Sequence, residues 1–364
     1  MTWTLSQFRR GDLVQIRTKE EILATLDENG CIDGMPFMPE MLEYCGRVMP
    51  VSAVAHKTCE TARRTWQGRK LDTTVHLEGL RCSGSAHGGC QAACNLFWKD
   101  AWLKPVSGRS TAAAVRRRSR CDEEKLYAAT HVTKDDGKIR YACQATMVTD
   151  ASRPLKWWDP RQYVMDVTTK NWSVLHVVRV LFFASLSALF RHAPIGWRAI
   201  KRFRELTHRL MTGRDVPDFE GAVPYGQQTP TGRLNLREGE RVRIKSKHEI
   251  EQTLQGIKNR GLSFGVEMSP YCGQITTVKA SVTKIIDEKT GEMQQMKQPC
   301  ITLEGVYCTS QYSECRLMCP RAIPSYWREL WLERVGEESE LPVAGQSGVP
   351  AMDTITNAEP ALVK

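Results

Sequence analysis

The stretch GDLVQIRTKEEILATL, residues 11–26, decides the fold because it recurs without a gap as GERVRIKSKHEIEQTL at residues 239–254. Three further blocks recur in the same order. They pair GMPFMPEMLEYCG (34–46) with GLSFGVEMSPYCG (261–273), TVHLEGLRC (74–82) with CITLEGVYC (300–308), and WKDAWLKPV (98–106) with WRELWLERV (327–335). Four blocks in one order make chance a poor explanation, so the sequence indicates an internal duplication.

Each copy opens with the pattern of a strand followed by a capped helix. Apolar residues alternate at Val14 and Ile16, and again at Val242 and Ile244, which is the period of a half-buried strand. In both copies a Thr or Ser, followed three residues later by Glu, then marks a helix start. The second and third blocks have the pattern of short strands, and residues 287–291 that of a hairpin tip. We predict an α+β chain with two tandem, mostly-β modules, each an SH3-like barrel or roll with an inserted helix.

The segments outside the copies differ from them in composition. The predicted organisation is an N-terminal Cys/His-rich module (1–105), a linker (106–230), a C-terminal Cys-rich module (231–335) and a disordered tail (336–364). The linker begins with a basic stretch that contains the run Arg116, Arg117, Arg118 and Arg120. A short strand is expected at 141–148.

The second half of the linker has the composition of two helices. The apolar stretch 172–190 precedes a basic amphipathic stretch at 197–211. The first stretch is slightly short and too polar for a membrane span, because it contains His176 and Arg179. We expect a helical hairpin that packs between the modules, with peripheral membrane contact through 172–211 as the alternative.

The charge and the cysteine content of the chain indicate its cellular compartment and the kind of partner it binds. Lys and Arg (51) outnumber Asp and Glu (41), and the resulting net charge of +10 favours acidic partners such as phosphates, nucleic acid or anionic lipid. The N-terminus has no apolar run of signal-peptide length, so we expect a cytoplasmic protein, peripheral to the inner face of the membrane if it contacts lipid. Thirteen cysteines in a reducing compartment indicate metal ligands, reactive thiols or small core residues rather than disulfides.

Four cysteines coincide when the two copies are aligned. The pairs are Cys45 with Cys272, Cys82 with Cys308, Cys90 with Cys315, and Cys94 with Cys319. Four thiolates suit a structural zinc ion, and they would also suit an iron–sulfur cluster. The alternative is that they are small buried residues of two similar cores, and for Cys45 and Cys272 the two explanations are about equal.

The first copy is richer in potential ligands than the second. His56, Cys59 and His87 have no match at the aligned positions of the second copy, so the first copy is the one in which we expect a functional site. Glu40 and Glu267 recur in both copies, and we interpret them as strand or turn residues rather than as acceptors around a metal. The predicted metal ligands are Cys45, His56, Cys59, Cys82, His87, Cys90, Cys94, Cys272, Cys308, Cys315 and Cys319.

Two tryptophan pairs, Trp98 with Trp102 and Trp327 with Trp331, have the spacing of neighbours on a helix. We predict that they pack in the core, although nearby Lys and Arg keep stacking on nucleic acid as an alternative. The sequence contains no P-loop, dinucleotide-binding, zincin or nucleophile-elbow motif. The common nucleotide-binding and hydrolase functions therefore have no support.

The chain resembles an uncharacterised bacterial family with duplicated cysteine-containing modules. The resemblance covers nearly all of it except the tail, through PFMPEM with YCG, LEG with Cys82, HGGCQA and YWRELWLE. It implies no activity, and at most a place in surface-polysaccharide or secondary-metabolite biosynthesis. We therefore predict a cytoplasmic zinc- or iron–sulfur-binding accessory of a biosynthetic complex. The alternatives are a redox or Lewis-acid metalloenzyme centred in the N-terminal module and a nucleic-acid-binding protein.

Overall fold

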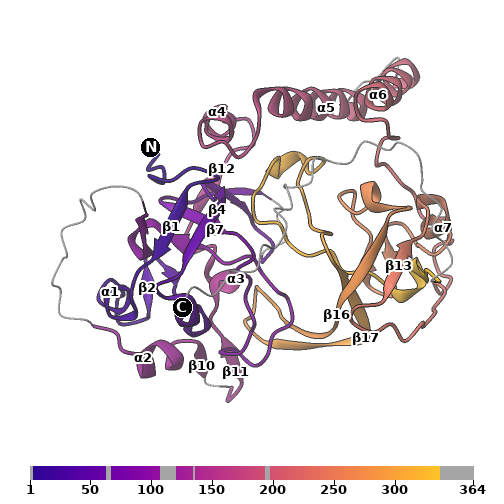
Figure 1. Cartoon of the computed structure of the whole chain (residues 1–364). Coiled ribbons are helices and arrows are strands. Elements are labelled where there is room, and N and C mark those ends of the chain that lie inside the picture. The colour runs from indigo at the N-terminus through magenta and orange to yellow at the C-terminus, as the bar shows by residue number, and fades with distance from the viewer. Residues whose placement is uncertain (1–2, 63–66, 107–119, 134–135, 193–196, 337–364) are drawn as a thin grey trace.

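A computed structural model describes residues 3–62, 67–106, 120–133, 136–192 and 197–336. The fold is α+β with antiparallel sheets, as predicted, and its two modules lie side by side (Figure 1). The SH3-like classification of the modules stays a prediction. The basic run at 116–118 and residues 337–364 of the predicted tail lie outside the described residues.

The same sheet core is built twice. In the N-terminal module the strand order is β8-β7-β4-β1-β9, and in the C-terminal module it is β17-β16-β13-β18. An isolated bridge between Ile301 and Trp327 stands where the first module has the pairing of β7 with β8. The strands of the first sheet are β1 (Leu13–Ile16), β4 (Val48–Val54), β7 (Thr74–Leu77), β8 (Trp98–Lys99) and β9 (Leu103–Pro105). Those of the second are β13 (Arg241–Ile244), β16 (Ile275–Ile286), β17 (Met293–Leu303) and β18 (Leu332–Arg334).

The predicted capped helices are confirmed in both modules. Helix α1 (Lys19–Leu23) begins at a capping box formed by Thr18 and Glu21, and α7 (Lys247–Glu251) begins at one formed by Ser246 and Glu249. A short hairpin and a 3-10 turn follow each helix. These are β2 (Cys31–Ile32), β3 (Met35–Pro36) and η1 (Pro39–Tyr44) in the first module, and β14 (Lys258–Asn259), β15 (Leu262–Ser263) and η3 (Ser269–Tyr271) in the second.

The four paired tryptophans form the centres of the two cores. Trp98, Trp102, Trp327 and Trp331 are all fully buried, which confirms the prediction of core packing. Their helical spacing was misleading, because each pair spans the end of a strand or bridge and a 3-10 turn, η2 (Asp100–Trp102) or η5 (Glu329–Trp331).

The first part of the predicted linker belongs to the N-terminal module. Cys121, Cys143 and Val148 are buried in the N-terminal core. The strand expected at 141–148 is wrong beyond Tyr141, because the chain turns there into a helix that packs on β3. The elements are α2 (Glu123–Ala128), β10 (His131–Thr133), β11 (Ile139–Tyr141), α3 (Gln144–Met147) and β12 (Arg153–Leu155), which completes a sheet with β5 (Lys57–Cys59) and β6 (Gly68–Lys70).

The predicted hairpin tip at 287–291 is confirmed, and it reaches the other module. Strands β16 and β17 extend from the C-terminal module toward α3 and β11 (Figure 1). The backbone N–H of Tyr141 donates to the carbonyl of Gly291 at 2.8 Å. Gln91 binds the same hairpin, since its side-chain oxygen accepts from Thr283 N at 2.7 Å and from Lys284 N at 3.1 Å. The second copy thus closes over a loop of the first.

The predicted helical hairpin forms, but it lies along one edge of the molecule and not between the modules (Figure 1). It consists of α5 (Val174–His192) and α6 (Trp197–Thr212), which pack on one another, and α4 (Arg161–Thr168) packs on α5. Val177 and Val180 of α5 form a small apolar cluster with Leu317 and Met318 of the C-terminal module. A buried ion pair between Lys57 and Asp166, with 2.5 Å between Nζ and Oδ2, connects β5 to α4.

His76 on β7 predicts a loss of stability in acid. Its side chain is fully buried, and burial lowers its pKa to about 4. Because the unfolded chain takes up a proton near pH 6.5 and the folded chain does not, stability is complete above that pH and falls as the pH drops toward 4. We expect this group to contribute about 1.4 kcal/mol per pH unit in that window. Urea unfolding of the wild type and of His76→Gln at pH 7 and pH 5 measures it: the variant should lose less stability, and equal losses would contradict the assignment.

Candidate metal centre

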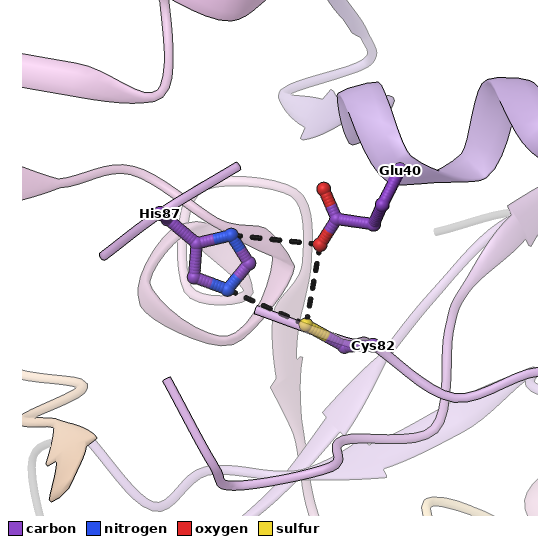
Figure 2. A group of neighbouring side chains, drawn as sticks. All are labelled: Glu40, Cys82 and His87. Carbon is purple, nitrogen blue, oxygen red and sulfur yellow. Dashed lines mark hydrogen bonds and ion pairs between the residues drawn. The ribbon is translucent and has the colours of Figure 1, made fainter. Parts of the chain in front are cut away.

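Three side chains of the N-terminal module converge on one point (Figure 2). The Sγ of Cys82 lies 3.4 Å from Glu40 Oε1 and 3.3 Å from His87 Nε2. The Nδ1 of His87 lies 3.5 Å from the same Glu40 oxygen. The candidate ligand atoms of the three residues all lie within 4.8 Å of one another.

Local sequence explains why these side chains meet. Glu40 stands in the first turn of η1, and Cys82 follows β7, which lies in the same module. His87 stands in a tight glycine loop, in which the N–H groups of His87 and Gly89 both donate to the carbonyl of Gly84. Gly84 has a φ of +74°, and a Cβ there would lie 2.1 Å from the carbonyl oxygen of Cys90, so no other residue fits.

The site is buried, and two of its polar atoms lack hydrogen-bond partners among the described atoms. The side chains of Glu40 and His87 are 4% and 1% exposed. Burial raises the pKa values of Glu40 and Cys82 and lowers the pKa of His87 to about 4. Among the described atoms, Glu40 Oε2 and His87 Nδ1 have no hydrogen-bond partner. Buried polar atoms usually have partners, and a bound cation would supply one while favouring the ionised carboxylate and thiolate.

A small cavity of about 30 Å³ adjoins the cluster. Further thiols line it, together with Glu288 from the tip of the β16–β17 hairpin. Its lining includes Cys82, His87, Cys90, Cys94, Cys143 and Glu288. The volume is enough for one water molecule. The first copy therefore supplies the donors, and the second copy closes the space next to them.

The second copy satisfies the matching carboxylate without any cation. Glu267, which aligns with Glu40, accepts four hydrogen bonds of 2.8–3.2 Å. The donors are Thr309 Oγ1, Gln311 N, Tyr312 N and Ser313 Oγ. Cys308, which aligns with Cys82, lies 3.3 Å from Ser310 Oγ. The carboxylate therefore has four donors in the second copy, whereas in the first copy it accepts from the Cys82 thiol and its Oε2 has no partner among the described atoms.

Comparison of the chain with protein-family models, with curated proteins and with solved structures finds no match. The resemblance to uncharacterised bacterial proteins stays a prediction. What the protein does must therefore be inferred from the geometry of its own residues.

The remaining predicted ligands are dispersed. Cys90 and Cys94 line the cavity beside the cluster, and Cys90 Sγ lies 3.4 Å from the N–H of Ile286. Cys45 and Cys272 end the turns η1 and η3 and pack, half-buried, against their respective cores. Cys315 is exposed beside a different cavity, next to α5 and α6. Among the described residues, the four aligned cysteines of neither copy form a group of ligand atoms within 4.8 Å.

Cys59 and Cys319 form a buried contact between the two copies. A hydrogen bond from the Cys319 thiol and the neighbouring Arg321 guanidinium lower the pKa of Cys59 to about 6. The Arg321 guanidinium also donates to Cys59 O at 3.3 Å, to Thr61 Oγ1 at 2.8 Å and to Glu288 Oε1 at 2.9 Å. These residues hold the modules together, and Glu288 also lines the cavity beside the Glu40 cluster.

His56 lies on another side of the N-terminal module. It is buried between β4 and β5, 3.2 Å from the carbonyl of Gln162 and 3.4 Å from Asp166 Oδ1. The desolvation of the ring lowers its pKa to about 3, so His56 is neutral and structural there. Sequence reasoning underrated Glu40 and missed Cys143 and Glu288 altogether. Only Glu40 left a signal in the sequence, because it recurs as Glu267 in the second copy.

Proposed function

We propose that the protein binds one zinc ion in its N-terminal module, with Glu40, Cys82 and His87 as ligands. The observation that carries the proposal is the contrast between the copies. Glu267 has four donors of its own, whereas Glu40 occupies the same position with one carboxylate oxygen unpartnered beside a thiol and an imidazole. A cation beside Glu40 stabilises that carboxylate, as the four hydrogen-bond donors stabilise the carboxylate of Glu267.

The donor set favours zinc over an iron–sulfur cluster. Zinc accepts thiolate, imidazole and carboxylate ligands together, whereas clusters are held mainly by several cysteines. Only one thiol, that of Cys82, belongs to the group of described residues within 4.8 Å. We therefore place zinc at this centre and retain no iron in the proposal.

Three protein ligands would leave one position of a tetrahedral ion for water. Zinc with such a position supplies Lewis-acid chemistry when a substrate can reach it. The cavity of about 30 Å³ has no room for a substrate, so the geometry favours a binding or structural role over an enzyme. The reduced thiol that this role requires is consistent with a cytoplasmic location, which we retain as part of the proposal.

Metal analysis of the purified full-length chain, with an absorbance spectrum, tests the proposal. We expect a colourless protein with about one zinc per chain. About two zinc ions per chain would instead support a site in each copy, and iron with visible absorbance would support a cluster. A folded protein that takes up no metal would contradict metal binding and leave Glu40 as a buried, protonated acid.

A further inference from the structure

The α5–α6 hairpin exposes its apolar residues instead of burying them. Leu175 on α5 and Leu210 on α6 are 75% and 76% exposed, and Leu206 is 58% exposed. The exposed apolar residues recur at helical spacing on both helices, which makes one stripe on each. They are Val174, Leu175, Val178, Phe182 and Leu189 on α5, and Phe203, Leu206, Leu210 and Met211 on α6.

The inner face of α6 is polar. Arg204 is buried, forms an ion pair with Asp218 and donates to Ser187 Oγ on α5 at 3.3 Å. One ring nitrogen of His208, also buried, lies 2.9 Å from the carbonyl oxygen of Arg214, and the other lies 3.2 Å from the hydroxyl of Tyr312. A helix that packs on a soluble core buries its apolar face, whereas α6 buries polar residues and exposes apolar ones. Its outer face is therefore suited to contact with an apolar surface.

Helix α5 is long and apolar enough to cross a membrane, and it is not an ordinary core helix. Its window Val174–Arg191 has a mean hydropathy of 1.7, yet only 22% of it is buried. The inner side of α5 contacts Leu317 and Met318 of the C-terminal module, and α6 packs along it. A helix that keeps these contacts lies along the surface of the protein, where its exposed side can meet a bilayer.

The positive charge of the hairpin indicates which kind of surface it binds. Residues 174–212 contain seven Lys or Arg residues and one acidic residue, Glu205. Of these, Arg198, Lys201, Arg202 and Arg209 are exposed on α6, interspersed with its apolar stripe. A second copy of the same hairpin would bring like charges together, whereas an anionic bilayer offers both acyl chains and negative headgroups.

We propose that the α5–α6 hairpin binds the surface of an anionic phospholipid bilayer. The two helices lie in the plane of the interface, with their apolar stripes among the acyl chains and the Lys and Arg side chains at the phosphate groups. This attachment is independent of the zinc centre.

Sedimentation of the full-length protein with lipid vesicles tests the proposal. We expect the protein to pellet with equimolar phosphatidylcholine and phosphatidylglycerol vesicles, to stay in solution with phosphatidylcholine alone, and to be released by high salt. The double variant Leu206→Asp/Leu210→Asp should partition at least about tenfold more weakly, because it places charge in the apolar stripe. Lys201→Glu/Arg202→Glu should weaken binding comparably and remove most of its salt dependence.

Ile257→Asp is the matched control, because Ile257 is 52% exposed in the C-terminal module, outside the hairpin. It should pellet like the wild type, and far-ultraviolet circular dichroism should show that every variant is folded. Wild-type protein that stays in solution with the anionic vesicles overturns the proposal. So does undiminished binding of the Leu206→Asp/Leu210→Asp variant. A wild-type dimer in light scattering that the same variant turns into a monomer, without vesicle binding, would assign the face to self-association and overturn it equally.

Discussion

Replacement of Cys82 by serine is expected to remove zinc from the protein while leaving it folded. The thiolate is the one sulfur ligand of the proposed centre. Loss of a residue that only hydrogen-bonds to a metal ligand weakens metal binding by about 10- to 100-fold, so loss of the ligand itself should weaken zinc binding by more than about a hundredfold. Glu40→Gln and His87→Ala should weaken it in the same direction. Zinc content after dialysis against a weak chelator measures the effect.

The duplication provides the control. Cys308→Ser and Glu267→Gln change the aligned residues of the second copy, whose carboxylate has its own donors. Both variants should keep the zinc content of the wild type, although Glu267→Gln should be less stable because it disrupts a buried hydrogen-bond network. Equal loss of zinc from Cys82→Ser and Cys308→Ser would show that the two copies share one kind of site, against our account.

Truncation of either core tryptophan is expected to have the largest effect on stability. Trp102 and Trp331 are fully buried at equivalent positions, and each contacts a phenylalanine edge to face, Phe37 or Phe264. Trp102→Ala and Trp331→Ala should each lower the free energy of unfolding of their module by about 3–5 kcal/mol, through lost burial and the cavity left behind. Chemical unfolding followed by circular dichroism measures both.

An exposed residue of the same sheet serves as the comparison. Leu13 is 55% exposed on β1, so Leu13→Ala should change stability by less than about 0.5 kcal/mol. If Trp331→Ala destabilised the protein no more than Leu13→Ala, the C-terminal copy would not be a folded core of the kind described. A large effect of one tryptophan alone would show that the copies are not energetically equivalent.

Local patterns of the sequence predicted the local parts of the fold. The alternation at Val14 and Ile16 and the Thr18 capping box depend on neighbours along the chain, so they could be read directly. Because the second copy repeats these patterns, the same strand and capped helix could be predicted there. The strand expected at 141–148 failed because α3 is specified by tertiary packing on β3 rather than by its own pattern.

The metal centre could be predicted only in part, because it depends on contacts between distant segments. Cys82 and His87 are close in sequence and were identified together. Alignment paired Cys94 with Cys319, but Cys319 contacts Cys59 of the other copy instead. Aligned positions of a repeat share a backbone scaffold but have different neighbours, since Gln91 of the first copy contacts the β16–β17 hairpin, whereas Cys319 of the second copy contacts Cys59 at the end of β5.

Zinc K-edge X-ray absorption of the purified protein tests the central claim most directly, because it counts the sulfur ligands. Our account predicts a single sulfur at about 2.3 Å and a shell of nitrogen and oxygen at about 2.0–2.2 Å, which Cys308→Ser leaves unchanged. A shell of four sulfurs would contradict it and would assign the metal to the converging cysteines expected from the sequence.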